Sequence, residues 1–325
     1  MRRRQHEPLM QAIVVSQLGG PEVMQVSDVP RPEPGQDELL VRVLAAGVGP
    51  WDAHLRRGGW TGSLPYIPGG EFAGVVVDGT GADAGLDDGT PVYGYPGGLT
   101  GCYAQYVTCH VERLAPIPAG LNATEAAATP IAALTAYQGV IDILGISEGE
   151  RVLITAGAGG VGHFAVQLAR LRGAIITATA SPRHHDFLHK LGAALVVDHT
   201  AADWPEQVRR ETDGGTDRVL ACAAPTLAGA ARAARDGAVL ATPVHAELPL
   251  PDADRVRWRP YDGNPSGSHL IAMAPRFDDG SLSVHLSGRY FWQDAAEAHR
   301  VVEQGHTQGK LVLVVDEDLA AALEV

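Results

Sequence analysis

The chain has little cysteine and no long apolar run. Only three of its 325 residues are cysteines, and Cys102, Cys109 and Cys222 include no CxxC pair. An odd number of scattered thiols favours reduced, packed side chains, and it supports neither a structural zinc nor a thioredoxin-like redox centre. Because no stretch reads as a membrane helix or a secretion signal, the sequence predicts a cytoplasmic protein with no membrane partner.

Basic residues are also few, since 25 Lys and Arg face 38 Asp and Glu and give a formal charge of -13. No basic stripe balances this charge, which argues against nucleic acid or an anionic membrane as the main partner. The one basic cluster, Arg2 to Arg4, precedes Met10 and reads as a solvated tail or as the region before an alternative start. The 13 histidines are scattered, and no metal is expected from them.

The length of 325 residues is typical of two domains. Residues 11 to 126 contain short strand-like runs separated by Pro- and Gly-rich turns, as in Pro30 to Gly35. The expected strands are Ala12–Val15, Glu38–Ala45, Gly74–Asp78, Pro91–Tyr93 and Ala104–Val107. Many short strands with proline-rich loops predict a mainly antiparallel, barrel-like domain.

The pattern changes near residue 124. Ala123 to Gly145 is alanine-rich with helical periodicity, and strands then alternate with helices. The expected strands are 151–155, 174–180, 194–198, 217–223 and 237–242, and the expected helices are 161–172, 182–191, 204–212 and 226–235. This alternation predicts an α/β fold with a doubly wound parallel sheet.

The alternation fails after residue 245. Leu248 to Ser268 carries four prolines and reads as an irregular loop or a hairpin insert. We then expect a helix at 269–279, a strand at Leu282–Leu286, a helix at Asp294–Gln304 and a strand at Lys310–Val315. The last strand is expected to return to the first domain. The predicted domains are therefore 10–126 with 269–325, and 127–268.

A glycine fingerprint lies at the start of the second domain. Gly157, Gly159 and Gly162 follow the apolar run Arg151–Thr155 and precede the helical stretch His163–Arg172. In a strand-turn-helix of this kind the glycines allow a tight turn, close approach of a pyrophosphate and close packing of the helix. The alternative is a structural glycine turn in a chain with 39 glycines. The context favours a dinucleotide site.

Five ordered motifs resemble one known family. They are Ala45–Asp52, Pro68–Val76, Leu134–Tyr137, Ala156–Gly162 and Gly309–Leu313. Together they resemble the medium-chain dehydrogenase/reductase superfamily, and within it the zinc-free quinone oxidoreductase branch, the zeta-crystallin-like enzymes. The resemblance covers residues 10 to 315. It implies a GroES-like, β-rich catalytic domain, a Rossmann domain and a homodimer.

The resemblance also implies that the chain has no catalytic zinc. Zinc-dependent relatives carry a cysteine after the first motif and a Gly-His-Glu in the second, whereas this chain has Gly49-Pro50-Trp51 and Gly69-Gly70-Glu71. The four-cysteine lobe of those relatives is missing as well. Without a Lewis acid, oxidation of an alcohol is not expected, and reduction of an activated acceptor remains.

The resemblance assigns cofactor positions residue by residue. The second strand of the nucleotide domain ends without an acidic residue, and Ser181 and Arg183 match the family's positions for a 2′-phosphate, so NADPH is the expected cofactor. A solvated basic helix start is the alternative. The further positions are Thr135 on the nicotinamide side, Gly160 and Val161 at the pyrophosphate, His199 beside the adenosine, and Cys222 and Thr242 at strand ends. A surface role for His199 and a packing role for Cys222 and Thr242 remain alternatives.

The acceptor is expected to be a small hydrophobic quinone or α,β-unsaturated carbonyl compound. The candidate pocket residues are Pro50, Trp51 and Asp52, with Trp60, Tyr66 and Tyr103 as walls or hydrogen-bond donors. Asp52 either takes part in the reaction or anchors its loop. Relatives carry asparagine where this chain has Gly49, which predicts more space beside the nicotinamide. The 248–268 insert either covers the substrate or forms a dimer contact.

Two other functions remain open. One is a trans-acting enoyl reductase on carrier-bound acyl or polyketide intermediates, against which the net negative charge counts because carrier proteins are acidic. The other is a non-catalytic NADPH-binding protein. The sequence identifies neither the substrate nor the stereochemistry nor the proton donor.

Overall fold

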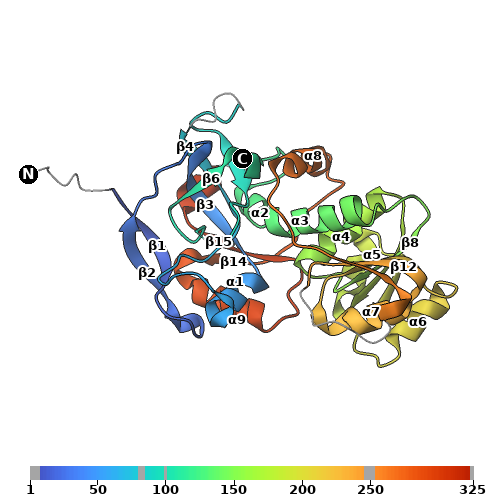
Figure 1. Cartoon of the computed structure of the whole chain (residues 1–325). Coiled ribbons are helices and arrows are strands. Elements are labelled where there is room, and N and C mark those ends of the chain that lie inside the picture. The colour runs from blue at the N-terminus through green and yellow to red at the C-terminus, as the bar shows by residue number, and fades with distance from the viewer. Residues whose placement is uncertain (1–7, 80–84, 99–100, 245–252, 323–325) are drawn as a thin grey trace, which may run out of the picture. The chain divides into compact units, whose positions relative to one another are not determined.

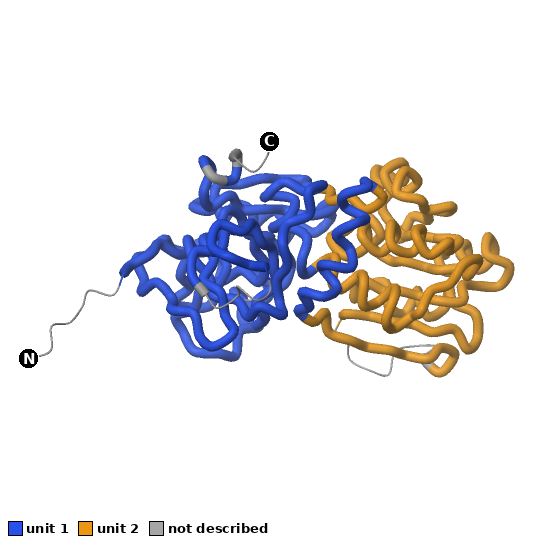
Figure 2. Tube along the Cα trace, turned by 90° about the horizontal axis from the view of Figure 1, so that it is seen from above, with its two compact units in different colours: residues 1–131, 265–280, 286–325 blue, residues 132–264, 281–285 orange. Residues whose placement is uncertain are grey.

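The computed structural model describes residues 8–79, 85–98, 101–244 and 253–322. The chain divides into two compact units (Figure 2). Unit 1 comprises Met1–Ile131, Pro265–Gly280 and Leu286–Val325, and unit 2 comprises Ala132–Asn264 and Ser281–His285. Among the described residues, no helix combines the length and apolar character needed to cross a membrane.

Unit 1 is built around a seven-stranded sheet with the order β14-β15-β3-β4-β5-β7, in which β6 also pairs with β3. The pairs are antiparallel except for β14 with β15. These strands are β3 (Glu38–Val48), β4 (Phe72–Gly79), β5 (Pro91–Gly94), β6 (Tyr106–His110), β7 (Leu114–Pro116), β14 (Leu286–Phe291) and β15 (Lys310–Val314). A separate antiparallel pair joins β1 (Leu9–Val15) to β2 (Met24–Pro30). As predicted, the last strand returns to the first domain, because β15 pairs with β3.

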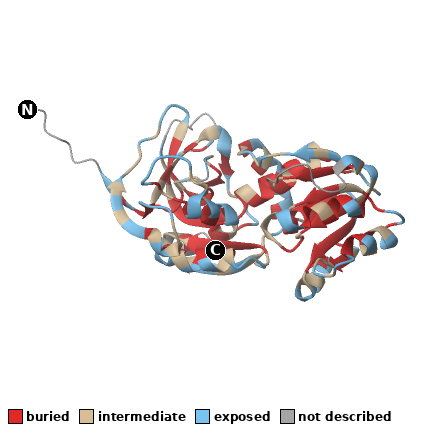
Figure 3. Ribbon diagram, turned by 60° about the horizontal axis from the view of Figure 1, so that its bottom comes forward, coloured by how far each residue is buried: buried red, intermediate tan, exposed pale blue. Residues whose placement is uncertain are grey.

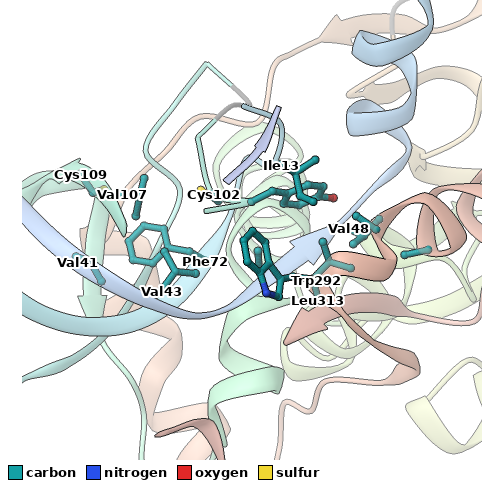
Figure 4. Close-up of a cluster of buried hydrophobic side chains, with 14 of the residues drawn as sticks. Ile13, Val41, Val43, Val48, Phe72, Cys102, Val107, Cys109, Trp292 and Leu313 are labelled. Carbon is teal, nitrogen blue, oxygen red and sulfur yellow. The ribbon is translucent and has the colours of Figure 1, made fainter. Parts of the chain in front are cut away.

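Short helices complete unit 1. They are η1 (Pro21–Val23), α1 (Pro50–His54), the π-helical turn η2 (Leu55–Gly59), η4 (Val111–Arg113), α2 (Ala123–Ala127), α8 (Gly267–Asp278), η9 (Trp292–Asp294), α9 (Ala295–Glu303) and α10 (Glu317–Ala322). The core gathers apolar side chains from several strands around Phe72 and Trp292 (Figure 4). The strand β3 is buried along most of its length, because it lies in the middle of the sheet. Figure 3 shows the buried residues in the interior of each unit and the exposed residues on the outside.

Unit 2 contains a six-stranded parallel sheet with the order β10-β9-β8-β11-β12-β13. The strands are β8 (Arg151–Thr155), β9 (Ile175–Ala180), β10 (Leu195–Asp198), β11 (Thr216–Ala221), β12 (Ala234–Thr242) and β13 (Arg257–Pro260). The helices are α3 (Pro130–Tyr137), η5 (Gln138–Ile143), α4 (Gly160–Leu171), η6 (Pro182–His184), α5 (His185–Leu191), α6 (Trp204–Glu211), η7 (Ala224–Thr226), α7 (Leu227–Ala233) and η8 (Ala253–Arg255). Figure 1 shows α4 and α5 on one face of this sheet and α6 and α7 on the other, which confirms the doubly wound prediction.

Three local predictions were wrong. The 248–268 insert is not wholly irregular, because β13 forms a sixth parallel strand beside β12, although residues 248–252 lie outside the described residues. The strand expected at Leu282–Leu286 begins instead at Leu286 and runs to Phe291. The helix expected from Ala123 to Gly145 is broken before Pro130, since proline cannot donate the backbone hydrogen bond that a continuous helix needs.

Candidate active site

The glycine turn of unit 2 has the geometry of a nucleotide cradle. The helix α4 starts at Gly160, directly after the turn that follows β8, and no side chain caps its first amides. A Cβ on Gly162 would lie 2.3 Å from the carbonyl oxygen of Ala156, whereas one on Gly159 would meet only that oxygen, at 3.3 Å. The third glycine is therefore needed for close packing, and the second leaves the backbone open to a ligand.

The amides at the start of α4 are available for an anion. The backbone bond from His163 N–H to the Gly159 carbonyl, 3.1 Å long, is the first of the helix. The amides of Gly160 and Val161 precede it, so the helix itself does not use them. Helix N-termini favour negative charge for this reason. These groups fit the pyrophosphate of a dinucleotide.

Basic side chains gather after β9. Ser181 precedes η6, and Arg183 is exposed, with its Nε donating to Nε2 of His184 at 3.0 Å. His185 follows, and its Nε2 lies 3.3 Å from the carbonyl of Ala180. Sequence reasoning named Ser181 and Arg183 but missed the two histidines, whose position directly after the strand was the available signal. This group suits a phosphate better than a ribose hydroxyl, because it offers donors and no acidic side chain at the strand end.

The remaining predicted cofactor residues lie in or beside the sheet of unit 2. Thr135 is buried in α3, where its carbonyl accepts a 2.8 Å hydrogen bond from the Tyr261 hydroxyl. His199 directly follows β10, and its Nδ1 is a buried atom without a partner among the described residues. Cys222 and Thr242 stand at the ends of β11 and β12, so parallel pairing brings both to the carboxyl edge of the sheet.

Two of these residues have structural contacts. The hydroxyl of Thr242 donates to the Ala221 carbonyl at 2.8 Å and accepts from the Val244 amide at 3.1 Å. The backbone amide of Cys222 donates to the hydroxyl of Thr155 at 3.1 Å, and burial raises the pKa of its thiol to about 12. The packing role that the sequence left open is thus present at Thr242, and Cys222 carries a neutral thiol.

A buried carboxyl lies at the end of β3 in unit 1. Asp52 in α1 is 5% exposed, and its Oδ2 accepts the Gly49 N–H at 2.8 Å. The nearby Tyr103 hydroxyl favours the ionised form of Asp52. Burial raises the pKa of Asp52 to about 7, and the charge of Glu71 adds to this effect, against the opposing Gly49 amide, Lys310 and Tyr103. Asp52 is therefore about half protonated near neutral pH.

The charges beside Asp52 form an ion pair that sequence reasoning missed. Lys310 Nζ lies 2.7 Å from Glu71 Oε1, and the two side chains are 7% and 2% exposed. Lys310 also donates to the Val48 carbonyl at 3.1 Å, while Glu71 Oε2 accepts the Ile131 amide at 2.7 Å. Glu71 lies in the motif Pro68–Val76 and Lys310 in the motif Gly309–Leu313. The sequence signal that could have found them is a charged residue next to or within a strand that is otherwise apolar.

Tyr66 supplies a hydroxyl close to this carboxyl. Burial and then the charge of Asp52 raise the pKa of Tyr66 to about 12, so the group stays protonated. The residue is 7% exposed, and among the described residues its hydroxyl has no hydrogen-bond partner. Trp60 stacks on the ring with centroids 4.6 Å apart. A buried, unpaired donor is costly unless a ligand uses it.

The structure thus brings together Asp52, Tyr66 and Tyr103 among the five predicted catalytic residues. Pro50 is exposed, and Trp51 is 38% exposed with its ring edge-on to His54 at 6.0 Å. A Cβ on Gly49 would find Asp52 Oδ2 and Lys310 Nζ at 3.8 Å and nothing closer. Room for a side chain therefore exists where relatives are expected to carry asparagine.

Within the described ranges, no group of three or more His, Cys, Asp or Glu side chains is arranged to hold a metal ion. The segments where zinc-dependent dehydrogenases are expected to carry cysteine and histidine are Gly49-Pro50-Trp51 and Gly69-Gly70-Glu71 here. Glycine offers neither thiolate nor imidazole, so the donor set does not fit a catalytic zinc.

Two family models match the chain. Residues 35–119 match the "Alcohol dehydrogenase GroES-like domain" and residues 191–313 match the "Zinc-binding dehydrogenase" model. A chloroplastic quinone-oxidoreductase homolog from Spinacia oleracea is 38% identical over 202 residues, which are 59% of this chain and 61% of that protein. A mycocerosic acid synthase-like polyketide synthase from Mycobacterium tuberculosis is 32% identical over 321 residues, covering 91% of this chain but 15% of the synthase. The chain thus spans less than two thirds of these relatives.

Solved structures match over nearly the full length. An NAD-dependent alcohol dehydrogenase is 33% identical with a TM-score of 0.86, covering 94% of this chain and 100% of its own. The quinone oxidoreductase of Coxiella burnetii is 28% identical with a TM-score of 0.86, covering 95% and 100%. A mycobacterial protein complexed with NADPH is 27% identical with a TM-score of 0.83, covering 94% and 100%.

Proposed function

Because the chain belongs to the medium-chain dehydrogenase/reductase superfamily and is similar to its quinone oxidoreductases, we propose that it is an NADPH-dependent, zinc-independent reductase. Its acceptor is a quinone or an α,β-unsaturated carbonyl compound. The observation that carries this proposal is a buried carboxyl with a pKa of about 7 close to a buried, unpartnered hydroxyl.

NADPH is supported by the residues of unit 2. The open glycine turn and the first amides of α4 fit a pyrophosphate, and Ser181, Arg183 and the following histidines offer donors to a 2′-phosphate. When bound, NADPH supplies a hydride. Thr135 and His199 are the candidate contacts to the nicotinamide and adenosine parts. A similar protein is complexed with NADPH, whereas another is called NAD-dependent, so the choice rests on the residues after β9.

The chemistry required of unit 1 is to stabilise charge and to deliver a proton. Reduction of an enone at its β-carbon leaves negative charge on the carbonyl oxygen and requires one proton at the α-carbon. The Tyr66 hydroxyl is the candidate donor to that oxygen, since it is buried, protonated and unpaired. Asp52 is the candidate source of the proton, because its pKa of about 7 makes it an acid near neutral pH. Reduction of a quinone by a hydride likewise leaves negative charge on an oxygen and requires one proton, which is delivered to an oxygen instead of a carbon.

Zinc independence follows from the donor set rather than from an absent ion. With Gly49 and Gly70 at the ligand positions, polarisation of the acceptor falls to hydrogen-bond donors such as Tyr66. Metal analysis of the purified protein is expected to find no stoichiometric zinc, and chelators are expected to leave the rate unchanged. Loss of activity on chelation that zinc restores would refute this part of the proposal.

The proposal that the chain is a reductase is tested by following NADPH consumption with quinones, alkenals and enoyl thioesters. Turnover of quinones or alkenals supports the proposal. Turnover of enoyl thioesters alone favours a trans-acting enoyl reductase on carrier-bound acyl chains, to which the similarity to a polyketide synthase points and against which the charge of -13 counts. Tight NADPH binding without turnover of any acceptor would leave a non-catalytic NADPH-binding protein.

A homodimer is part of the proposal. The edge strand β13 lies at the end of the six-stranded sheet and pairs only with β12 among the described strands, which leaves one edge for a second copy. Of the two roles left open for the insert, this placement favours the dimer contact over a cover for the substrate. Light scattering is expected to give twice the mass of 34.1 kDa, and a charged substitution at Trp258 on β13 is expected to yield a monomer.

A further inference from the structure

A chain of buried polar side chains runs through unit 1 and ends at Asp52. It begins at Arg56 in η2, whose side chain is fully buried. The guanidinium donates to the Gly19 carbonyl at 2.6 Å through Nη1, pairs with Glu303 through Nη2, and donates from Nε to Nδ1 of His299 at 3.2 Å. In each of these contacts the guanidinium is the donor.

The arginine fixes the state of the next residue. Guanidinium nitrogens only donate, so Nδ1 of His299 must be the acceptor and carry no hydrogen. Burial and then the charge of Arg56 lower the pKa of His299 to about 3, so the ring is neutral at working pH. Its one hydrogen is therefore on Nε2. That nitrogen lies 3.4 Å from the hydroxyl oxygen of Tyr103, with the two rings edge-on at 5.9 Å.

The direction of hydrogen bonding set by Arg56 and His299 continues from Tyr103 toward Asp52. The Tyr103 oxygen accepts from His299, so its own hydrogen is left for the carboxyl of Asp52, whose charge acts on Tyr103. Tyr103 is fully buried, and burial together with the charges of Asp52 and Glu71 holds its pKa well above the usual value, so it does not lose the hydrogen. The hydrogen bonds from Arg56 to His299 and from His299 to Tyr103 therefore run in one direction.

We infer that Arg56, His299 and Tyr103 form a positioning chain that keeps the Tyr103 hydroxyl aimed as a hydrogen-bond donor at the Asp52 carboxyl. The inference rests on the proposed function only in giving Asp52 the role of acid. Once Asp52 has released its proton, the Tyr103 hydroxyl and the Gly49 amide stabilise the carboxylate. Tyr103 and His299 are positioning residues in this scheme, because each acts through its neighbour.

Other charged or titratable groups also face Asp52. Lys310 favours its ionised form and Glu71 opposes it, while Tyr66 and Cys102 are neutral neighbours on other elements. None of these groups belongs to the chain from Arg56. Changes in the chain can therefore be compared at constant Lys310 and Glu71.

The first test is the tautomer of His299 in the protein without nucleotide or acceptor. Long-range ¹H–¹⁵N NMR spectra separate the three states of imidazole, and the signals of His299 are assigned by their loss in His299→Gln. A neutral ring with hydrogen on Nε2 from about pH 5 to about pH 8 is expected. A ring with hydrogen on Nδ1, or one that becomes charged in this range, would overturn the inference.

The second test measures the pKa of Asp52 itself by ¹³C NMR of the carboxyl, assigned by its loss in Asp52→Asn. Tyr103→Phe removes the donor and is expected to raise this pKa by about one unit, a tenfold weaker acid. Tyr106→Phe removes a hydroxyl from β6 and is the matched control, with no expected shift. Equal pKa values in the two variants would overturn the inference.

A third test compares two variants of His299 to separate its polar role from a packing role. His299→Gln keeps an N–H for Tyr103 and is expected to stay close to the original pKa of Asp52, whereas His299→Leu is expected to raise it. If His299→Leu does not fold, the comparison of Tyr103→Phe with His299→Gln decides. None of these readouts needs turnover. A protein without reductase activity but with these shifts would refute the proposed function alone, and an active protein without them would refute the chain alone.

Discussion

The pH dependence of stability tests the state of Asp52 without a substrate. Burial first, and the charge of Glu71 after it, raise the pKa of Asp52 from 3.8 to about 7 in the folded protein. The folded state therefore binds a proton more tightly than the unfolded chain, and this contribution to stability is lost as the pH rises from about 4 through about 7. At 1.36 kcal/mol for each pKa unit, the full loss is about 4 kcal/mol.

The replacement Asp52→Asn removes the titration and keeps an acceptor for the Gly49 amide. The free energy of unfolding is measured by urea denaturation at several pH values for both proteins. Relative to the original protein, the variant is expected to gain about 4 kcal/mol between about pH 4 and about pH 8. Asp88→Asn, at an exposed turn, is the control and is expected to show a constant difference.

If the difference in unfolding free energy between Asp52→Asn and the original protein does not change with pH, Asp52 ionises as an ordinary exposed carboxyl. It would then carry no proton near neutral pH, and its role as the acid would be refuted together with the argument from burial. A gain of the opposite sign would mean that the ionised carboxylate is stabilised by Lys310 more than it is penalised by burial.

Three further predictions concern the two halves of the reaction. Arg183→Ala is expected to weaken NADPH binding about tenfold or more and NADH binding little, measured by calorimetry, whereas Arg210→Ala is expected to change neither; equal losses would refute the phosphate role. Tyr66→Phe is expected to lower kcat/KM about 100-fold while stability changes by less than about 1 kcal/mol, because the hydroxyl has no partner in the described protein; an unchanged rate would exclude it as a donor. Gly49→Asn is expected to raise KM about tenfold for bulky acceptors and little for small ones, since the Cβ has room beside Asp52 Oδ2 and Lys310 Nζ; equal effects on both would contradict the space argument.

The parallel sheet of unit 2 was predictable because its signals are local. The strand β8 is an apolar run bounded by turns, and the glycines after it have one common meaning in such a setting. The strand β13 was missed because arginines occupy it at the exposed edge of the sheet, where an apolar pattern is not required. In β14 a glycine inside the strand weakens the strand signal.

The polar site of unit 1 was predictable only in part, because its residues meet through long-range pairing. Sequence motifs pointed to Asp52, and the aromatic residues Tyr66 and Tyr103 were named without a reason to prefer them. Nothing in the sequence near His299 indicates that it faces Tyr103, since that contact exists only because α9 packs on the core that contains Tyr103. The fully buried Arg56 likewise reads as an ordinary surface residue in its sequence context, Leu55 to Gly59.

The direction of the hydrogen bonds between Arg56, His299 and Tyr103 determines how these residues act on Asp52. Arg56 cannot accept, so His299 must accept at Nδ1 and donate at Nε2, and Tyr103 must then donate to Asp52. A buried carboxyl without donors such as the Gly49 amide and the Tyr103 hydroxyl would hold its proton too tightly to release it, and one with more donors would have no proton to give. The value of about 7 for Asp52 lies between these limits, which is where an acid that works near neutral pH has to be.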